Sequence, residues 1–168
     1  MIHVCSLSRL HETVHETRAQ HIVTLLKHSD RVERPLHIDE ANHLVLGMDD
    51  ISNPMDGYTH PAEEHVHELI DFVQRWDRRA PIVMHCYAGI SRSTAGAFIS
   101  ACALNPDRDE ATIAQAIRDS SKTAAPNIML VGHADRILSR KGRMIAAVEA
   151  LGPGLPSLEG HPFRLDLE

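Results

Sequence analysis

The chain has 168 residues, of which 43% are hydrophobic and 24% are charged. This length and balance suit a single globular domain that buries a core of its own. The formal net charge of −6 argues against nucleic acid or an anionic membrane as the main partner. No stretch reaches the ~18 consecutive apolar residues that a membrane span needs.

The three cysteines, Cys5, Cys86 and Cys102, are an odd number, unlike the paired framework of a small secreted protein. The first residues, MIHVCSLSRLHE, contain neither a basic leader nor a long apolar core, so they do not resemble a secretory signal. A reactive thiolate survives best in a reducing compartment. We therefore expect a cytoplasmic protein.

Strands and helices are expected to alternate along the first half of the chain. Short apolar runs predict strands over 1–7, 21–26 and 42–48, with possible extended structure around 36–38. Ser8 is suited to be the N-cap of a helix over 9–18.

The clearest helix is expected after Pro61, because proline is tolerated at the first helical position. Glu63 and Glu64 favour the positive end of the helix dipole, and apolar residues then recur at helical spacing over 66–73. A helix of this kind packs one face on a core and leaves the other in water.

The second half predicts a buried strand over 81–86 and then helices over 91–104, 109–120, 127–139 and 142–151. Alternation of strands and helices around an apolar central strand predicts an α/β fold, with a mostly parallel central sheet flanked by helices on both faces. We expect the domain to span 1–151. Residues 152–168, which are punctuated by proline and glycine, are expected to form a C-terminal tail.

The most informative segment is HCYAGISRST, residues 85–94. It follows the apolar strand and precedes an apolar helix, so it forms a loop that carries Cys86 to a helix N-terminus. The unpaired N–H groups and the dipole at such an end favour a bound anion. This order of elements places a sulfur nucleophile beneath an anion site.

The residue types after Cys86 suit a nucleophilic thiolate. Ordinary thiols are only a few per cent ionised at neutral pH, so an attacking cysteine needs nearby positive charge or oriented amides. A tight loop over 87–92 can turn its amides inward as an anion-binding nest. Gly89 suits a position of positive φ or close backbone approach, and Arg92 offers a planar fork for two phosphate oxygens.

The neighbours of the loop matter more than the Cys-x5-Arg spacing alone. His85 can orient the loop and favour the thiolate, and Ser93 can donate a hydrogen bond to the sulfur when it becomes the leaving group. The same spacing recurs at Cys102 and Arg108, but the intervening ALNPD has no glycine and Cys102 lies inside the expected helix. No anion nest is expected there.

HCYAGISRST resembles the signature loop of the cysteine-dependent protein tyrosine phosphatases, and most of all that of the dual-specificity branch. In that family the cysteine attacks phosphorus, the arginine binds the phosphoryl oxygens, and the next hydroxyl residue assists breakdown of the phosphocysteine. The resemblance implies these roles for Cys86, Arg92 and Ser93. It implies a phosphate cradle made of Tyr87, Ala88, Gly89, Ile90, Ser91 and Arg92.

The resemblance also implies the family's α/β fold, in agreement with the periodicity. The substrate it implies is a phosphomonoester, either on a protein, as phosphotyrosine or another phosphorylated residue, or on a small molecule. It implies no metal and no other cofactor.

A phosphatase of this kind needs an acid, because release of an alkoxide or phenoxide is slow without protonation. The family carries an aspartate on a loop upstream of the cysteine, and the segment LVLGMDDISNPMDG offers Asp49, Asp50 and Asp56. The pair in MDDIS resembles the family's acid loop, in which the second aspartate tends to be the acid. We expect Asp50 to be the general acid, with Asp56 and Asp49 as alternatives.

Asn127 follows a proline before another expected helix and is suited to be its N-cap. Dual-specificity phosphatases have a similar Pro-Asn pair at this stage of the chain, where it borders the active site. The resemblance makes Asn127 a candidate to support the phosphate loop or to orient a water.

Two other functions stay open. Residues 11–15, HETVH, match the zinc-protease pattern H-E-x-x-H, with His21 at the spacing of a third ligand. Arg18 stands where that pattern needs a glycine, however, and His21 is expected to begin a strand. A phosphatase fold can also bind phosphorylated partners without turnover, although the intact cysteine motif argues against this alternative.

Overall fold

A five-stranded sheet runs through the molecule in the order β3-β2-β4-β1-β5. The computed structural model describes residues 1–167. The strands are β1 (Ile2–Ser6), β2 (His21–Leu26), β3 (His43–Gly47), β4 (Ile82–Cys86) and β5 (Phe163–Leu165). The first four pair in parallel, and β5 runs antiparallel to β1. The expected mostly parallel α/β sheet is confirmed.

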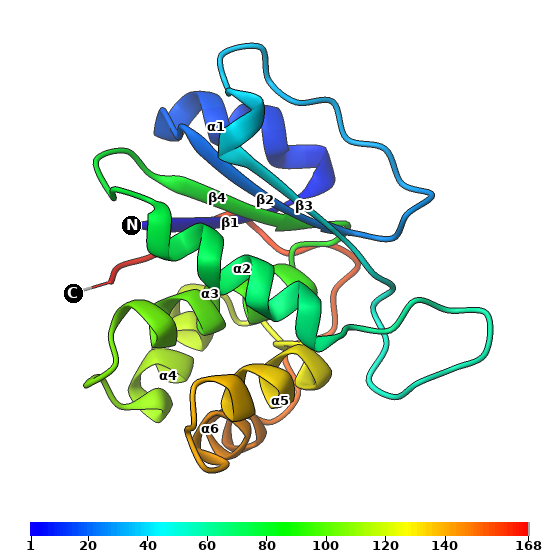
Figure 1. Cartoon of the computed structure of the whole chain (residues 1–168), viewed down its shortest axis with the longest axis vertical. Coiled ribbons are helices and arrows are strands. Elements are labelled where there is room, and N and C mark those ends of the chain that lie inside the picture. Colours follow the sequence, from blue (N-terminus) through cyan, green and yellow to red (C-terminus); the bar gives the residue numbers. More distant parts are fainter. Residues whose placement is uncertain (168) are drawn as a thin grey trace.

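Helices cover both faces of the sheet, as expected, but unequally (Figure 1). The first face carries α1 (Leu10–Thr17). The second carries α2 (Glu63–Arg75), α3 (Arg92–Leu104), α4 (Glu110–Ser120), α5 (Ile128–Ile137) and α6 (Arg143–Leu151). None of the helices formed by residues 1–167 has the length and apolar character to cross a bilayer.

The face that carries α1 is completed by the segment that connects β2 to β3. Val32 and Ile38 pack there against the apolar cluster that includes Leu10 and Val14 of α1. Residues 36–38 are not extended, contrary to expectation: the N–H of Ile38 closes a turn on the carbonyl of Pro35 at 3.0 Å. A single buried isoleucine anchors this loop, so no strand is needed.

The start of α1 differs from the sequence expectation. Residues Leu7–Arg9 form a short 3-10 turn, and α1 begins only at Leu10. Ser8 therefore does not cap the helix. Its hydroxyl donates to the carboxylate of Glu159, far along the chain.

The start of α2 also differs, because the helix begins at Glu63 and Pro61 lies outside it. The ring nitrogen Nδ1 of His65 accepts a hydrogen bond from the N–H of Ala62 at 3.0 Å. A side chain within the first turn thus satisfies one of the backbone donors at the start of the helix.

The segment expected as a tail is built into the fold. Phe163 and Leu165 of β5 are buried and Arg164 between them is exposed, which is the alternation of a half-buried edge strand. Residues 152–162, which we call the strap, connect α6 to β5. The chain returns along them from the helical layer to the edge of the sheet beside β1 (Figure 1).

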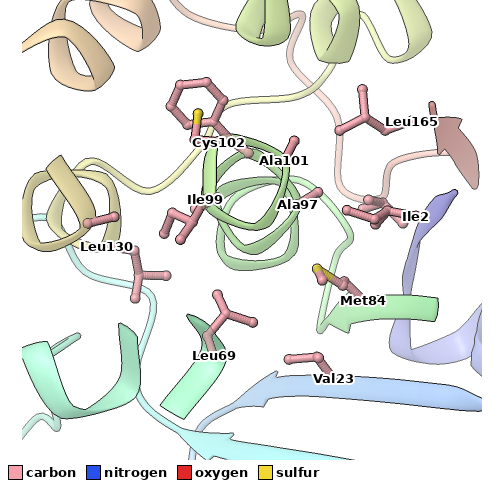
Figure 2. Packing of buried hydrophobic residues seen from close by; sticks show 14 of the residues in the cluster. Ile2, Val23, Leu69, Met84, Ala97, Ile99, Ala101, Cys102, Leu130 and Leu165 are labelled. Atoms are coloured by element: carbon pink, nitrogen blue, oxygen red, sulfur yellow. The ribbon is translucent and has the colours of Figure 1, made fainter. Parts of the chain in front are cut away.

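Helix α3 lies at the centre of the larger helical layer, and every residue from Arg92 to Cys102 is buried. Figure 2 views it nearly end-on, with Met84 and Val23 of the sheet on one side and Leu69 of α2 and Leu130 of α5 around it. A helix packed on all sides has little freedom to shift. Its N-terminus is therefore a fixed point at the end of β4.

Candidate active site

Cys86 ends the central strand β4, which has β2 on one side and β1 on the other. All five residues of this strand are buried, and Cys86 itself is 2% exposed and opposite Ser6 in the register with β1. Arg92 begins α3 just beyond the loop that follows. Two rigid elements thus fix the ends of the loop over 87–91.

Four carbonyl groups of this loop are bonded outward, to three other segments of the chain. Backbone N–H groups of those segments donate to them: Leu7 to Tyr87 (3.2 Å), Gly160 to Ala88 (2.9 Å), Ala125 to Ile90 (2.9 Å) and Asn127 to Ser91 (3.2 Å). A peptide plane directs its C=O and N–H to opposite sides, so outward carbonyls turn neighbouring amides inward. No acceptor within residues 1–167 bonds the N–H groups of Ala88, Ile90 or Ser91. Such unpaired, converging amides form an anion-binding nest.

The sulfur of Cys86 lies within reach of two donors. The N–H of Gly89 donates to Sγ at 3.3 Å, and Oγ of Ser93 lies 3.1 Å from Sγ. Gly89 has φ +72°, and a Cβ at this position would lie 2.8 Å from the backbone carbon of Cys5. Glycine is therefore required here by conformation and by space, and the N–H that it brings to the sulfur favours a thiolate.

Arg92 is 6% exposed and is anchored at one end of its guanidinium. Nη1 donates to the carbonyl of Met48 at 2.8 Å, while the buried Nε has no partner among residues 1–167. A buried donor without a partner costs about 1–3 kcal/mol, which an oxyanion would recover by accepting its hydrogen bond. Nothing in the sequence marks the contact to Met48, because any residue has a carbonyl.

Of the three aspartates expected near the site, Asp50 contacts the phosphate loop. Its Oδ1 accepts hydrogen bonds from Oγ of Ser91 at 2.7 Å and from Nδ2 of Asn127 at 2.9 Å. Its Oδ2 has no partner in the described part of the chain. The side chain is therefore held over the loop with one oxygen available.

Asp49 and Asp56 are placed differently. Asp49 closes the base of residues 49–59, which we call the acid loop. Its N–H donates to the carbonyl of Thr59 and its Oδ2 accepts from the N–H of Thr59, each at 2.8 Å. Asp56 is exposed on the outer part of that loop. The structure thus brings neither of the alternative acids to the phosphate loop.

Asn127 caps α5, as expected, because its Oδ1 accepts from the N–H groups of Met129 at 3.0 Å and Leu130 at 3.2 Å. Its amide nitrogen donates to Asp50 and also, at 3.1 Å, to the carbonyl of Ile51. One side chain thus joins the start of α5 to the acid loop.

His85 is fully buried on β4 and acts as a neutral group. Burial, more than any other cause, lowers the pKa of His85 to about 3, so its imidazole carries no charge at neutral pH. Its Nε2 lies 2.7 Å from Oγ1 of Thr24, which in turn lies 2.8 Å from Nε2 of His43. Any help that His85 gives the thiolate is therefore positional and does not come from a positive charge.

The three histidines of the zinc pattern are not brought together. His11 and His15 are exposed on α1. His21 begins β2, as expected, and packs on the other face of the sheet, with its ring 6.1 Å from that of Phe72 and 6.5 Å from that of Trp76. Among residues 1–167, no group of three or more His, Cys, Asp or Glu side chains is arranged to hold a metal ion.

A family model described as "Polymorphic toxin system, DSP-PTPase phosphatase" matches residues 6–107. The chain belongs to this phosphatase family. The match runs from the end of β1 to just beyond α3, and so includes Asp50, Cys86 and Arg92. The strap and Asn127 lie outside it. No curated protein matches the chain.

Solved structures share the fold of this phosphatase. The Cydia pomonella PTP-2 phosphatase is 19% identical with a TM-score of 0.61, over 83% of this chain and 84% of that one. DUSP15 is 16% identical with a TM-score of 0.66, over 89% of each chain. Human DUSP28 is 12% identical with a TM-score of 0.64, over 83% of this chain and 92% of that one. The chain therefore has the fold of the dual-specificity and tyrosine phosphatases.

Proposed function

We propose that the protein hydrolyses phosphomonoesters through a phosphocysteine formed on Cys86. The observation that supports this most directly is the loop over 87–91, in which the N–H of Gly89 donates to the sulfur and the N–H groups of Ala88, Ile90 and Ser91 have no partner among residues 1–167. Arg92 begins α3 directly after the loop, and its buried Nε, which has no partner among residues 1–167, is a further charged donor for a bound oxyanion. Together these donors complement the negative charge of a phosphoryl group in the transition state of its transfer.

In the first step, the thiolate of Cys86 attacks phosphorus in line with the leaving oxygen. The S–P bond forms as the P–O bond breaks, and the loop amides and Arg92 hold the equatorial oxygens. Asp50, protonated at its available oxygen, gives that proton to the leaving group, which departs as an alcohol or phenol. Ser91 and Asn127 keep the carboxyl group in place.

In the second step, water attacks the phosphocysteine and the S–P bond breaks. The Asp50 carboxylate accepts a proton from that water, which returns it to the acid form. Ser93, whose Oγ lies 3.1 Å from Sγ, donates a hydrogen bond to the departing sulfur. Inorganic phosphate leaves, and the enzyme is ready for another turnover.

The substrate we propose is phosphotyrosine or another phosphorylated residue of a protein. Tyr87 and Ile90, the larger side chains of the loop, are uncharged, and Arg92 is its one cation. One phosphoryl group satisfies such a loop. Recognition of a multiply phosphorylated ring would favour additional lysines there.

The function is tested by comparing wild type with Cys86→Ser on p-nitrophenyl phosphate and on a phosphotyrosine peptide. Loss of the nucleophile should lower kcat by about 10⁴-fold or more, while the peptide should still bind, because the amides and Arg92 remain. Cys102→Ala is the matched control and should retain activity.

Two results would contradict the proposal. Binding of the phosphopeptide by wild type without any turnover would make the protein a phospho-binding module. Hydrolysis that persists in Cys86→Ser but disappears with a chelator or with His15→Ala would assign the chemistry to a metal.

A further inference from the structure

A pocket of about 330 Å³ adjoins the phosphate loop on the side of β1. It is lined by Leu7, Ser8, Tyr87, Leu158 and Glu159. Tyr87 directly follows Cys86, so a substrate whose phosphoryl group lies over the sulfur passes close to the mouth of this pocket. The proposed chemistry does not use the pocket.

The strap that forms one wall of the pocket is fixed to the rest of the molecule. At its beginning, Arg118 of α4 donates to the carbonyls of Leu151 at 2.8 Å and Gly152 at 2.9 Å. At its end, the N–H of Gly160 donates to Ala88 of the phosphate loop at 2.9 Å, and β5 follows. Leu158 and Glu159 are therefore held in place beside the loop.

The pocket combines an apolar surface with an acid. Tyr87 is 64% exposed and Leu158 is 97% exposed. Two large apolar side chains left in water beside a reactive loop are suited to pack against part of a substrate. Because Glu159 lies next to Leu158, that substrate part meets a carboxylate as well.

Hydrogen bonds to Glu159 favour its ionised form. Its Oε1 accepts hydrogen bonds from the hydroxyls of Ser6, at 2.5 Å, and Ser8. These two bonds, with Ser6 the larger cause, lower the pKa of Glu159 below its ordinary value. Its Oε2 has no partner among the described residues.

One arginine and one histidine of this chain also lie near the carboxylate. Arg9 and His161 line a smaller cavity that Glu159 also borders. Arg9 is already paired with Glu12 at 2.7 Å, so it neutralises Glu159 only in part. A further cation is still favoured at the free oxygen, and the net charge of −6 draws cationic partners to the whole molecule.

We infer that this pocket binds an arginine or lysine side chain of the substrate, within about two residues of the phosphorylated residue. The inference rests on the proposed function, because it concerns a peptide held at Cys86. The methylene stem of a long basic side chain packs on Tyr87 and Leu158 while its charged head pairs with Glu159. Leu158 and Glu159 lie beyond the span that matches the family model, whereas Leu7, Ser8 and Tyr87 lie within it.

The test uses phosphotyrosine peptides that are neutral except for one arginine, placed in turn at each of the two positions before and after the phosphotyrosine. An otherwise identical peptide with glutamine there is the reference. We expect wild type to prefer arginine at one of these positions by about two- to fivefold in kcat/KM, as for a partly exposed ion pair. Glu159→Gln, which keeps an acceptor for Ser6 and Ser8, should abolish that preference and leave p-nitrophenyl phosphate hydrolysis unchanged.

Glu149→Gln is the matched control, because it removes the same charge from an exposed position on α6. It should keep the arginine preference, which separates the pocket from the field of the whole molecule. An arginine preference that survives in Glu159→Gln would overturn the inference, as would a wild type that turns over all peptides equally. A preference for leucine over arginine would also overturn it.

The failure of the proposed function gives a different result. If neither p-nitrophenyl phosphate nor any peptide is hydrolysed, the chemistry assigned to Cys86 is wrong. The affinities of the same peptides for Cys86→Ser, with and without Glu159→Gln, then decide the inference by binding alone. Equal affinities for the arginine and glutamine peptides would overturn it.

Discussion

The chain contains two Cys-x5-Arg segments, and only one of them is organised around an anion site. After Cys86, the N–H groups of three loop residues and the buried Nε of Arg92 have no partner among residues 1–167. Cys102 is instead inside α3. Its companion Arg108 extends to the surface, where it donates to the carbonyl of Asp166 at 3.3 Å.

The acids around the two cysteines differ in the same way. Near Cys102, Glu110 is paired with Arg140 at 2.9 Å, and Asp135 accepts from the N–H groups at the start of α6. Near Cys86, Oδ2 of Asp50 has no partner in the part of the chain that the structure describes. The comparison shows that spacing alone defines no site: chemistry is available where folding leaves donors and acids unpaired.

The largest difference is expected in the reactivity of the cysteines toward iodoacetate. Burial is the main cause that raises the pKa of both Cys5 and Cys102 to about 12, so both stay protonated at neutral pH. We expect Cys86 to be alkylated at least about 10³ times faster than either, because only about one in 10⁵ of the other two thiols is ionised. Peptide mass spectrometry of the alkylated protein measures the three rates.

Inorganic phosphate should protect Cys86 from alkylation and leave the alkylation rates of the other two cysteines unchanged.

The raised pKa values of Cys5 and Cys102 also make the stability of the folded protein depend on pH. The folded state holds these protons more tightly than the unfolded chain, whose thiols titrate near 9.0. The resulting stability is complete below about pH 9 and is lost as the pH rises toward 12. Alkylation of Cys102 in the native protein as fast as Cys86 would erase the contrast.

The next largest difference is expected between substitutions of Arg92 and Arg108. Arg92→Lys keeps the charge but loses the planar fork and the bond to Met48, so we expect kcat/KM for p-nitrophenyl phosphate to fall by about 10²- to 10³-fold. Arg108→Lys, at the same spacing from the other cysteine, should change it by less than about twofold. Steady-state kinetics of both variants measure the difference.

Thermal unfolding provides the control for this pair, because a folded Arg92→Lys protein shows that lost activity is not lost structure. Equal activity of the two variants would mean that Arg92 does not hold the phosphoryl oxygens.

The four parallel strands and most of the helices could be predicted from sequence, because their signals are local, whereas β5 lies in the segment expected as a tail. A short apolar run that ends in His85 and Cys86 predicts β4, and the Pro-Asn pair predicts the cap of α5. The turn at 36–38 was mistaken for extended structure because one buried residue, Ile38, produces no periodicity that separates a loop from a strand.

The phosphate loop was also within reach of the sequence, since Gly89 and Arg92 are required by their own chemistry. The strap was not. Its contacts to the loop and to α4 are mostly made through backbone groups, such as the N–H of Gly160, and these leave no pattern in the residue types. Likewise, no local signal connects Ser6 with Glu159, which are joined only by the fold.

The smallest of the expected effects concerns the acid, and it depends on the leaving group. Asp50→Asn keeps an acceptor for Ser91 and Asn127 but has no proton to give. We expect kcat for an alkyl phosphate, whose leaving group needs that proton, to fall by about 10²-fold. The loss for p-nitrophenyl phosphate should be below about tenfold, because that leaving group departs readily as an anion. Asp56→Asn, on the outer part of the same loop, is the control and should leave both rates within about twofold. An equal loss for both substrates in Asp50→Asn would instead assign Asp50 a structural role, since only proton donation distinguishes one leaving group from the other.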